Sequence, residues 1–479
     1  MRRNLFFIYT PPIEDISRYT RIFLELIKSN KSNNIYILEC KGKNDLNKCV
    51  SNYRGERQKC LKCKSGILYL KNELLNTKNI FFINYEKSID ELSKIKSKSE
   101  LLNYSYEGIN IGKGINSYLI STLHDHNYNF SKNTSLIESQ LFSSVLTIQT
   151  LKFYLNLGID EIYLFNGRVS HHNALLEFSR FYKIPFKVFE MVFNPNKYEI
   201  SVNKALHDAN EYKNKIQNNW LKSTLTESKK SKIGTEFFKK NRFHFEKKKN
   251  GIFKYLKNNF QNEKIELITI FNSSRSEYEC VENWNSESFF KDDEDLISEI
   301  CQKFKNDPKK HFILRSHPNL AYYKNTQNKN TKKLKRLKNL LVIDSKTNLS
   351  SYELINISSK VITFGSTIGV EASYLGKPVI SIGDSAYKYL NVIYTPNNKD
   401  ELFSFINMKL KAKPISGSLK YGYYILEFGT KFKFQKKIEL KYNVLKYFIL
   451  NIFYKSKSTL LNPNFSLIYL KRKILNWKN

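Results

Sequence analysis

Residues 361–372 read Val-Ile-Thr-Phe-Gly-Ser-Thr-Ile-Gly-Val-Glu-Ala, and Gly-Lys-Pro follows at 376–378. The β-branched run predicts a buried strand, Gly365 predicts a tight turn, and the small residues after it predict the first turn of a helix. A strand, a tight turn and a helix in this order are typical of a parallel sheet that helices cover. The stretch therefore predicts an α/β fold of Rossmann type.

The same alternation of strands and helices continues on both sides of this stretch and recurs near the start of the chain. In the second half we expect strands at 265–271, 311–315, 340–343, 360–364 and 378–382, with helices at 295–304, 350–357 and 368–375. In the first half we expect strands at 4–9, 34–38, 80–83, 161–165 and 186–189, with helices at 16–27, 135–157 and 174–182. Two such runs predict two Rossmann-like domains that face each other across a cleft.

Changes in composition indicate where the domains end. The Lys- and Asn-rich residues 203–260 predict a helical connection between an N-terminal domain at 1–202 and a C-terminal domain at 261–430. Residues 431–479 mix Phe, Leu, Ile and Tyr with Lys, which predicts basic amphipathic helices at the end of the chain. Such helices can lie on an anionic membrane surface, or they can pack back onto the N-terminal domain.

The charge of the chain predicts an acidic partner. Lys and Arg number 79 against 44 Asp and Glu, which suits nucleic acid, an anionic membrane face or a phosphorylated small molecule. No zinc-finger repeat, RNA-binding aromatic signature or arginine-rich tail is visible, so we do not expect nucleic acid. The first apolar run is too short for a signal peptide, and no stretch approaches the ~20 apolar residues of a membrane span. We therefore expect a cytoplasmic protein that can also sit peripherally on the inner face of the membrane.

The strand at 311–315 leads into a polar loop that we expect to contact a ligand. Arg315 ends the strand, and His317-Pro318-Asn319 follows. Ligands in open α/β sheets lie beyond the carboxyl ends of the strands, and Pro318 limits the freedom of the loop. A protonated His317 can hydrogen-bond a phosphate and offset charge on a departing nucleotide. We therefore predict His317 as a catalytic residue and Arg315 and Pro318 as substrate-binding residues.

The turn after the strand at 360–364 predicts an anion site. Ser366 or Thr367 falls near the N-cap of a helix, where the first backbone N–H groups are free to bind an anion. Gly365 lets the backbone approach a ligand closely, and Glu371 can accept hydrogen bonds from ribose hydroxyls. Each feature alone is also found as an ordinary cap or loop. The two together, in one Rossmann-like unit, predict a nucleotide-sugar site.

Residues 265–383 resemble the C-terminal domain of capsular polysaccharide biosynthesis glycosyltransferases of the GT-B class. Kdo transferases of capsule assembly and cytidine-nucleotide-dependent sialyltransferases are similar in pattern, and glycerophosphotransferases of teichoic acid synthesis show a similar His-Pro element. The resemblance implies that His317, Pro318, Ser366 and Thr367 hold the phosphate and nucleotide of the donor, and that Glu371 binds its ribose. It also implies that the loop after the strand at 265–271 contributes Ser273, Ser274 and Arg275.

The N-terminal domain is then expected to hold the acceptor and the catalytic base. Asn166-Gly167-Arg168 resembles an Asn-Gly-Arg element of similar capsule proteins, and Arg168 can bind an acidic sugar or a phosphate; the alternative is a turn with a surface arginine. An inverting transferase needs a carboxylate to take the proton of the acceptor hydroxyl. Glu190, at the end of the strand at 186–189, is our first candidate and Asp15 the second, although either can be an ordinary polar residue.

Metal ligands are sparse in this sequence. Cys40, Cys49, Cys60 and Cys63 form an irregular cluster that predicts a structural zinc site; unligated thiols are the alternative. The Asp-Glu-Asp run at 293–295 is interpreted as a helix cap rather than a metal site. The reaction is expected to need no metal cofactor, because His317 and the helix N-terminus supply the positive charge.

These features together predict an enzyme that transfers a sugar from a nucleotide-activated donor, of the CMP-linked type, to a glycan or lipid-linked acceptor in capsule or lipopolysaccharide synthesis. The first alternative is a polyol-phosphate transferase that uses CDP-glycerol or CDP-ribitol. The second is a non-enzymatic protein that binds polyanions or membranes, and a nucleotide-sugar epimerase is a third.

Overall fold

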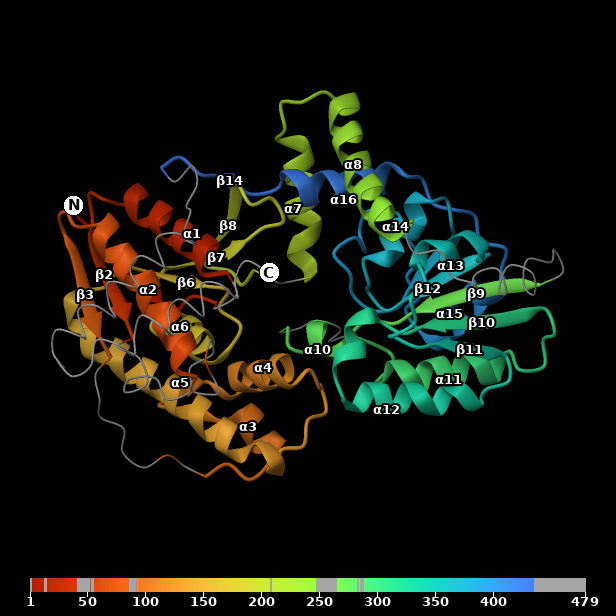
Figure 1. The fold of residues 1–479 in the computed structure, drawn as a ribbon, viewed down its shortest axis with the longest axis horizontal. Helices are drawn as coiled ribbons and strands as arrows, with labels where there is room; N and C mark the ends of the chain where they lie inside the picture. Colours follow the sequence, from red (N-terminus) through yellow and green to blue (C-terminus); the bar gives the residue numbers. More distant parts are fainter. Residues whose placement is uncertain are drawn as a thin grey trace, which may run out of the picture.

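The structure is a computed structural model. It describes residues 2–434 with the exception of residues 13–14, 41–51, 53–55, 86–91, 93, 207–208, 247–264, 282–283 and 285–287. The helices expected within residues 435–479 and the end of the expected connection at 247–260 lie outside the described part. Two lobes, each with its own sheet, lie side by side in Figure 1.

The first lobe is built on a seven-stranded sheet in the order β14-β8-β7-β6-β1-β2-β3. Five strands run parallel, namely β1 (Asn4–Tyr9), β2 (Asn34–Glu39), β3 (Ile80–Asn84), β6 (Glu161–Phe165) and β7 (Phe186–Met191). Two antiparallel strands, β8 (Lys197–Val202) and β14 (Thr430–Lys431), extend one edge. The five parallel strands agree with the sequence-based prediction, whereas the antiparallel edge was not expected.

Helices cover both faces of this sheet because alternate residues of its strands point to opposite sides. Leu5, Phe7 and Tyr9 pack against α1 (Ile16–Ser29) and α2 (Arg57–Glu73). Phe6 and Ile8 belong to the opposite core. That core includes side chains of α3 (Lys98–Asn103), α4 (Gly112–Leu123), α5 (Thr134–Tyr154) and α6 (Ser170–Phe181). A two-stranded ribbon of β4 (Ser105–Tyr106) and β5 (Ile109–Asn110) joins α3 to α4.

The second lobe contains a five-stranded, fully parallel sheet in the order β11-β10-β9-β12-β13. Its strands are β9 (Glu266–Phe271), β10 (Lys310–Arg315), β11 (Leu340–Ile343), β12 (Lys360–Thr363) and β13 (Val379–Ser381). One face packs against α11 (Asp293–Lys303) and α15 (Lys399–Asn407), and the other against α13 (Ser351–Ile357) and α14 (Ile368–Tyr374). The expected α/β fold with two Rossmann-like units is thereby confirmed.

The segment between the two sheets packs with the second lobe. Helices α7 (Ala209–Leu221) and α8 (Glu227–Glu246) contribute Ile216, Phe237 and Phe238 to its core, beside α16 (Ser416–Glu427). After α16 the chain crosses back toward the first lobe, below the tips of α7 and α8 in Figure 1, and places β14 in the first sheet. The buried Glu25 carboxylate accepts the backbone N–H groups of residues 433 and 434 and so anchors this crossing.

Candidate functional site

The loops that follow β9, β10 and β12 leave the second sheet at the same level. Phe271 is paired with Arg315 on one side and with Thr363 on the other, so the three strands end together. The Asn272 side-chain oxygen accepts the His317 N–H at 2.9 Å, and the Ser273 hydroxyl donates to the Phe364 carbonyl at 2.6 Å. The loop after β9 therefore lies between the His-Pro loop and the glycine turn. With neighbouring strands ~4.8 Å apart, the backbones of the two outer loops leave the sheet about 10 Å apart.

His317 begins a short 3₁₀ turn, Pro318–Tyr322, and its ring is partly buried. Nδ1 accepts the Asn319 N–H at 3.3 Å, which leaves Nε2 as the position that carries the proton in the neutral ring. Burial lowers the pKa of His317, and the nearby Glu277 carboxylate opposes that shift. Burial therefore favours the neutral ring, and the protonated ring that the sequence predicts on a phosphate stays a prediction. Nε2–H remains a donor for a phosphate.

Two buried groups next to His317 have no hydrogen-bond partner among the described residues. They are the Asn272 side-chain nitrogen and the Ser316 hydroxyl. A buried polar group without a partner costs roughly 1–3 kcal/mol, so native structures rarely leave one unsatisfied. Both groups lie at the carboxyl ends of adjacent strands, where an α/β sheet binds ligands. The Asn272 amide and the Ser316 hydroxyl are therefore available to bind a polar ligand at this edge.

The glycine turn after β12 requires glycine at its centre. Gly365 has φ +72°, and a Cβ there would lie 2.3 Å from the Asp384 carbonyl oxygen. Ser366 is partly buried and Thr367 is exposed. Thr367 occupies the N-cap position of α14, as the sequence predicts, and its hydroxyl makes no capping bond. Both hydroxyls lie at the same sheet edge as the His-Pro loop.

Glu371 is turned toward the interior of the second lobe. Its carboxylate accepts a hydrogen bond from the Tyr352 hydroxyl on α13. Burial raises the pKa of Glu371 to about 7, and the tyrosine bond opposes this. A ribose can reach the carboxylate only if the α13–α14 packing changes. The ribose role implied by the resemblance therefore stays a prediction.

Two arginines predicted to bind substrate, Arg315 and Arg275, form hydrogen bonds or ion pairs within the protein. The buried Arg315 guanidinium donates to the carbonyl oxygens of Asp344 and Thr347, so it fixes the loop after β11. Arg275 forms ion pairs with Asp292 at 2.9 Å and Glu279 at 2.7 Å. These protein groups satisfy part of each guanidinium, whereas Arg315 Nε and Arg275 Nε are buried and have no hydrogen-bond partner among the described residues. Arg315 and Arg275 therefore hold neighbouring loops in place, and their predicted contact with a ligand stays a prediction.

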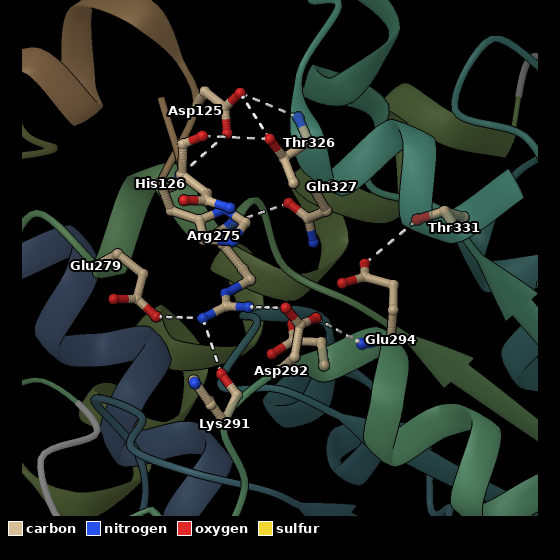
Figure 2. A network of polar contacts seen from close by, with 12 residues as sticks. Asp125, His126, Arg275, Glu279, Lys291, Asp292, Glu294, Thr326, Gln327 and Thr331 are labelled. Carbon is tan, nitrogen blue, oxygen red and sulfur yellow. Dashed lines mark hydrogen bonds and ion pairs between the residues drawn. The ribbon is translucent and has the colours of Figure 1, made fainter. Parts of the chain in front are cut away.

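Arg275 lies in a polar network that joins the lobes. Figure 2 shows Arg275 between Glu279 and Asp292, with Asp125 facing Thr326 from the other lobe. The Asp125 carboxylate accepts the N–H and the hydroxyl of Thr326, each at 3.0 Å, at the start of α12 (Thr326–Lys333). This contact fixes α4 of the first lobe against α12 of the second.

The acidic start of α11 is more than a cap. Asp292 is its N-cap residue and accepts the Glu294 N–H, whereas Asp293 and Glu294 are buried. Asp293 accepts the Tyr278 hydroxyl at 3.0 Å, and burial raises the pKa of Asp293 to about 7. Ser274 bonds with Ser276 at 3.1 Å close by, in the loop that leads to Tyr278. These residues hold the loop after β9 in place.

In the first lobe, Glu190 lies at the end of β7 and is held by two donors. The Asn166 amide donates to Oε2 at 2.6 Å, and the Met191 N–H donates to Oε1 at 2.8 Å. Burial raises the pKa of Glu190 to about 7, and these bonds and the Arg168 charge oppose that shift. A carboxyl group with a pKa near the working pH suits a general base. Asn166, with φ +58°, turns the chain from β6 toward Arg168.

Asp15, the second candidate base, caps a helix. Its carboxylate accepts the Arg18 N–H at the start of α1 and lies 3.6 Å from the Arg18 guanidinium. A short acidic side chain at this position stabilises the helix N-terminus. The structure therefore favours a capping role for Asp15 over a catalytic one.

A cavity of about 560 Å³ lies where the lobes meet. Its walls come from α4, the turn at 166–168, α6, the segment at 203–206 and the loop at 279–281 of the second lobe. Arg168 lines this cavity and donates from Nη1 to the Ser121 hydroxyl at 3.1 Å and to the Cys280 sulfur. Asn166 and Arg168 are thus brought together with Glu190 beside this cavity, and the acceptor site stays a prediction.

Three buried polar residues near the carboxyl ends of β1 and β6 in the first sheet were not predicted from the sequence. Thr10 follows β1, and its hydroxyl lies 2.7 Å from His172 Nε2 and 3.1 Å from His171 Nε2. Burial lowers the pKa of both imidazoles, so they are neutral near pH 7. The available signal was the pair of histidines in the first turn of α6, three and four residues after Arg168.

The predicted zinc site is only partly within the described residues. Cys49 lies outside them, and the Cys60 sulfur accepts the Asn52 amide at 3.0 Å. Within the described part of the chain, no three His, Cys, Asp or Glu side chains gather to hold a metal ion. The four-cysteine site therefore stays a prediction. None of the described helices is long and apolar enough to span a membrane.

The fold and the sheet-edge site define a GT-B-type protein with a polar binding edge on its second Rossmann-like unit. The family model for "Capsule polysaccharide biosynthesis protein" matches residues 285–403, which contain the His-Pro loop and the glycine turn. The expected resemblance to capsule polysaccharide biosynthesis glycosyltransferases is thereby confirmed over this region. No curated protein matches the chain.

Solved structures similar to this chain include glycosyltransferases and epimerases. The beta Kdo 2,4 transferase KpsC of Thermosulfurimonas dismutans has 13% identity and a TM-score of 0.35, with 55% of this chain and 79% of that chain covered. The UDP-GlcNAc 2-epimerase of Neisseria meningitidis, bound to UDP-GlcNAc, has 13% identity and a TM-score of 0.27 over 94% of this chain and 100% of that chain. The Methanocaldococcus jannaschii UDP-GlcNAc 2-epimerase has 15% identity and a TM-score of 0.28, covering 88% and 98%.

Proposed function

We propose that this protein transfers a sugar from a nucleotide-activated donor, of the CMP-linked type, to a growing capsule or lipopolysaccharide chain. The observation that carries the proposal is the edge of the second sheet, where Asn272 and Ser316 present buried donors beside His317 that have no partner in the described part of the chain. These groups suit the phosphate and sugar hydroxyls of a nucleotide sugar. The match of residues 285–403 to the capsule polysaccharide biosynthesis family supports a role in building such a chain.

In the proposed reaction His317 stabilises the departing nucleotide. Nε2–H donates to a phosphate oxygen, and the negative charge that develops there favours protonation of the ring. The hydroxyls of Ser366 and Thr367 and the N–H groups of the glycine turn bind the remaining phosphate oxygens. No metal ion is required for this stabilisation, because donors from the chain surround the developing charge.

Glu190 is the proposed base that takes the proton of the acceptor hydroxyl. Its pKa is about 7, and it lies next to the cavity-lining Asn166. It belongs to the first lobe, whereas the donor edge, defined by Asn272, His317 and the turn at Gly365, belongs to the second. Transfer then joins an acceptor held by the first lobe to a donor held by the second. We place this reaction in the cytoplasm at the inner membrane surface, where the +35 net charge favours anionic lipids and lipid-linked acceptors.

A nucleotide panel tests the donor class. Thermal unfolding of the whole chain is followed with CMP, CDP, UDP and GDP, and we expect a selective rise with CMP or CDP. A selective rise with UDP would overturn the cytidine donor. Turnover of CDP-glycerol in place of a CMP-sugar would favour the polyol-phosphate alternative, and release of a free sugar without an acceptor would favour an epimerase or hydrolase.

The role of His317 is tested by His317→Ala with Asn319→Ala as the neighbouring control. We expect the histidine variant to lose transfer by roughly 100-fold or more while its unfolding temperature stays close to that of the parent. The control removes the side chain that bonds Glu277 and should keep most of the activity. Full activity of His317→Ala would remove this residue from the mechanism.

A further inference from the structure

The cavity between the lobes carries a cation that its own walls do not neutralise. Its three acidic side chains are each paired: Glu177 with Arg180 at 2.6 Å, Glu211 with Lys204 at 2.7 Å, and Glu279 with Arg275 at 2.7 Å.

Arg168, by contrast, lines the cavity without an ion pair to any described carboxylate. Its Nη1 donates to two neutral groups, Ser121 and Cys280.

The guanidinium of Arg168 also keeps donors available. A guanidinium has five N–H groups, and Nε and Nη2 of Arg168 make no hydrogen bond to a described residue. The side chain is half-buried, its side-chain hydrogen-bond acceptors among the described residues are neutral, and the Glu190 carboxylate acts on it only through space, so its charge is held at a cost. A bound anionic group would remove that cost by a charge-assisted bond, and a planar carboxylate or a phosphate fits the fork of an arginine.

The cavity has the size and composition of a saccharide site. A volume of about 560 Å³ falls within the roughly 300–1,000 Å³ of typical small-ligand pockets. Asn116, Asn173 and Ser117 line it with amide and hydroxyl groups that suit sugar hydroxyls. Its walls come from both lobes, so a bound ligand is held at the junction where the two substrates must meet.

We propose that this cavity binds the acceptor saccharide and that Arg168 selects acceptors that carry a negative charge, either a sugar carboxylate or a phosphate. The identification of the ligand as the acceptor rests on the proposed function. Binding of an anionic saccharide to this cavity can be measured without catalysis. Arg168 is thereby a specificity-determining residue, and the cavity is the subsite that distinguishes acidic glycans from neutral ones.

Occupation of Arg168 also acts on Glu190. Asn166 connects the two residues: its oxygen accepts the Arg168 N–H at 3.2 Å, and its nitrogen donates to Glu190. The positive charge of Arg168 lowers the pKa of Glu190. An anion on the guanidinium offsets this effect and raises the pKa of Glu190, so the ionised carboxylate is a stronger base but is present in a smaller fraction at pH 7. Binding of an acidic acceptor therefore moves the optimum for transfer to higher pH.

Calorimetric titration of the full chain tests the proposal with three probes. Glucuronate carries a carboxylate, glucose 1-phosphate carries a phosphate, and glucose is neutral. We expect at least one charged probe to bind more than 10-fold tighter than glucose, and which of the two binds tells the carboxylate source from the phosphate source. Equal binding of all three, or of none, would overturn the proposal.

Variants assign the binding to Arg168. Arg168→Gln should weaken the charged probe by 10-fold or more and leave glucose unchanged. Arg180→Gln is the matched control, because Arg180 lines the same cavity but is paired with Glu177, and it should change binding less than 3-fold. If Arg168→Gln folds poorly, Arg168→Lys is measured instead. This variant keeps the positive charge but loses the bidentate donor geometry of the guanidinium, so affinity for the charged probe should fall several-fold. Unchanged binding in either folded variant refutes the assignment.

The nucleotide panel separates this inference from the proposed function. If CMP or CDP raises the unfolding temperature but charged probes bind independently of Arg168, only the acceptor inference fails. If charged probes bind through Arg168 but no nucleotide binds, the cavity is an anionic-saccharide site of a protein without the proposed transfer activity.

Discussion

The bond from Asn166 to Glu190 sets the pH at which the proposed base becomes active. Glu190 acts as a base only when ionised, so the rate should rise with pH through an apparent pKa of about 7. The Asn166 donor favours the ionised form. Its removal should therefore raise the pKa of Glu190 and move the rising limb of the pH profile to higher pH.

The size of that shift follows from the strength of the bond. A hydrogen bond to a charged group contributes roughly 1.5–3 kcal/mol, and each pKa unit corresponds to about 1.36 kcal/mol, so the shift is about 1–2 units. The ionised fraction at pH 7 then falls from about one half to between about 0.1 and 0.01. We expect transfer at pH 7 to drop about 5- to 50-fold and to recover to within ~3-fold of the parent at pH 9 to 10.

Asn166→Gly is the change of choice, because the backbone at this position has φ +58°, which glycine adopts without strain. Asn79→Gly is the matched control: Asn79 has φ +64° and lies at the start of β3, so its profile should stay unchanged. The assay is kcat/KM for sugar transfer between pH 5.5 and 10, with Glu190→Gln to confirm that the limb belongs to Glu190. A limb that stays in place in Asn166→Gly, or that moves to lower pH, would refute the reasoning.

Two further outcomes concern the second lobe. Gly365→Ala should destabilise the chain by about 1–3 kcal/mol in urea unfolding and weaken nucleotide binding, whereas Gly376→Ala, with φ +76° and no neighbour near its Cβ, isolates the strain of positive φ alone. Tyr352→Phe removes the donor to Glu371. Because the pKa of Glu371 is raised in the folded state, ionisation of this carboxyl lowers the free energy of unfolding as pH rises toward about 7. Loss of the tyrosine hydroxyl raises this pKa further and so increases the loss of stability. The loss in unfolding temperature should therefore be larger at pH 8 than at pH 5, and an equal loss at both would contradict this reasoning.

The strands and loops of the donor edge could be predicted from sequence because their signals are local. A β-branched run followed by glycine, or by His-Pro, defines a strand and the loop that leaves it within about ten residues. The antiparallel β8 and the short β14 were missed, because β14 is fixed by pairing with residues more than 200 positions away. No pattern near Thr430 indicates that partner.

The direction of the arginine side chains could not be predicted for a similar reason. Arg315 was expected at the ligand because it ends a strand, but its partners Asp344 and Thr347 follow β11, the next strand in the sheet. Arg275 is likewise paired with Asp292, which precedes α11. Position at a strand end predicts where the backbone of a residue lies. Burial and neighbours from other elements determine the direction of its charged group.

The loop after β9 links the two halves of the proposed reaction. It begins at Asn272 and Ser273, which lie at the donor edge, and ends at Cys280, which lines the acceptor cavity. Its far end is held by the first lobe, because the Ser117 hydroxyl donates to the Cys280 carbonyl at 2.6 Å and Arg168 contacts the Cys280 sulfur. A donor that orders the near end of this loop therefore also fixes one wall of the acceptor cavity. The two proposed sites share one short segment, so we predict that a nucleotide bound at the edge of the second sheet favours the cavity shape that binds the acceptor.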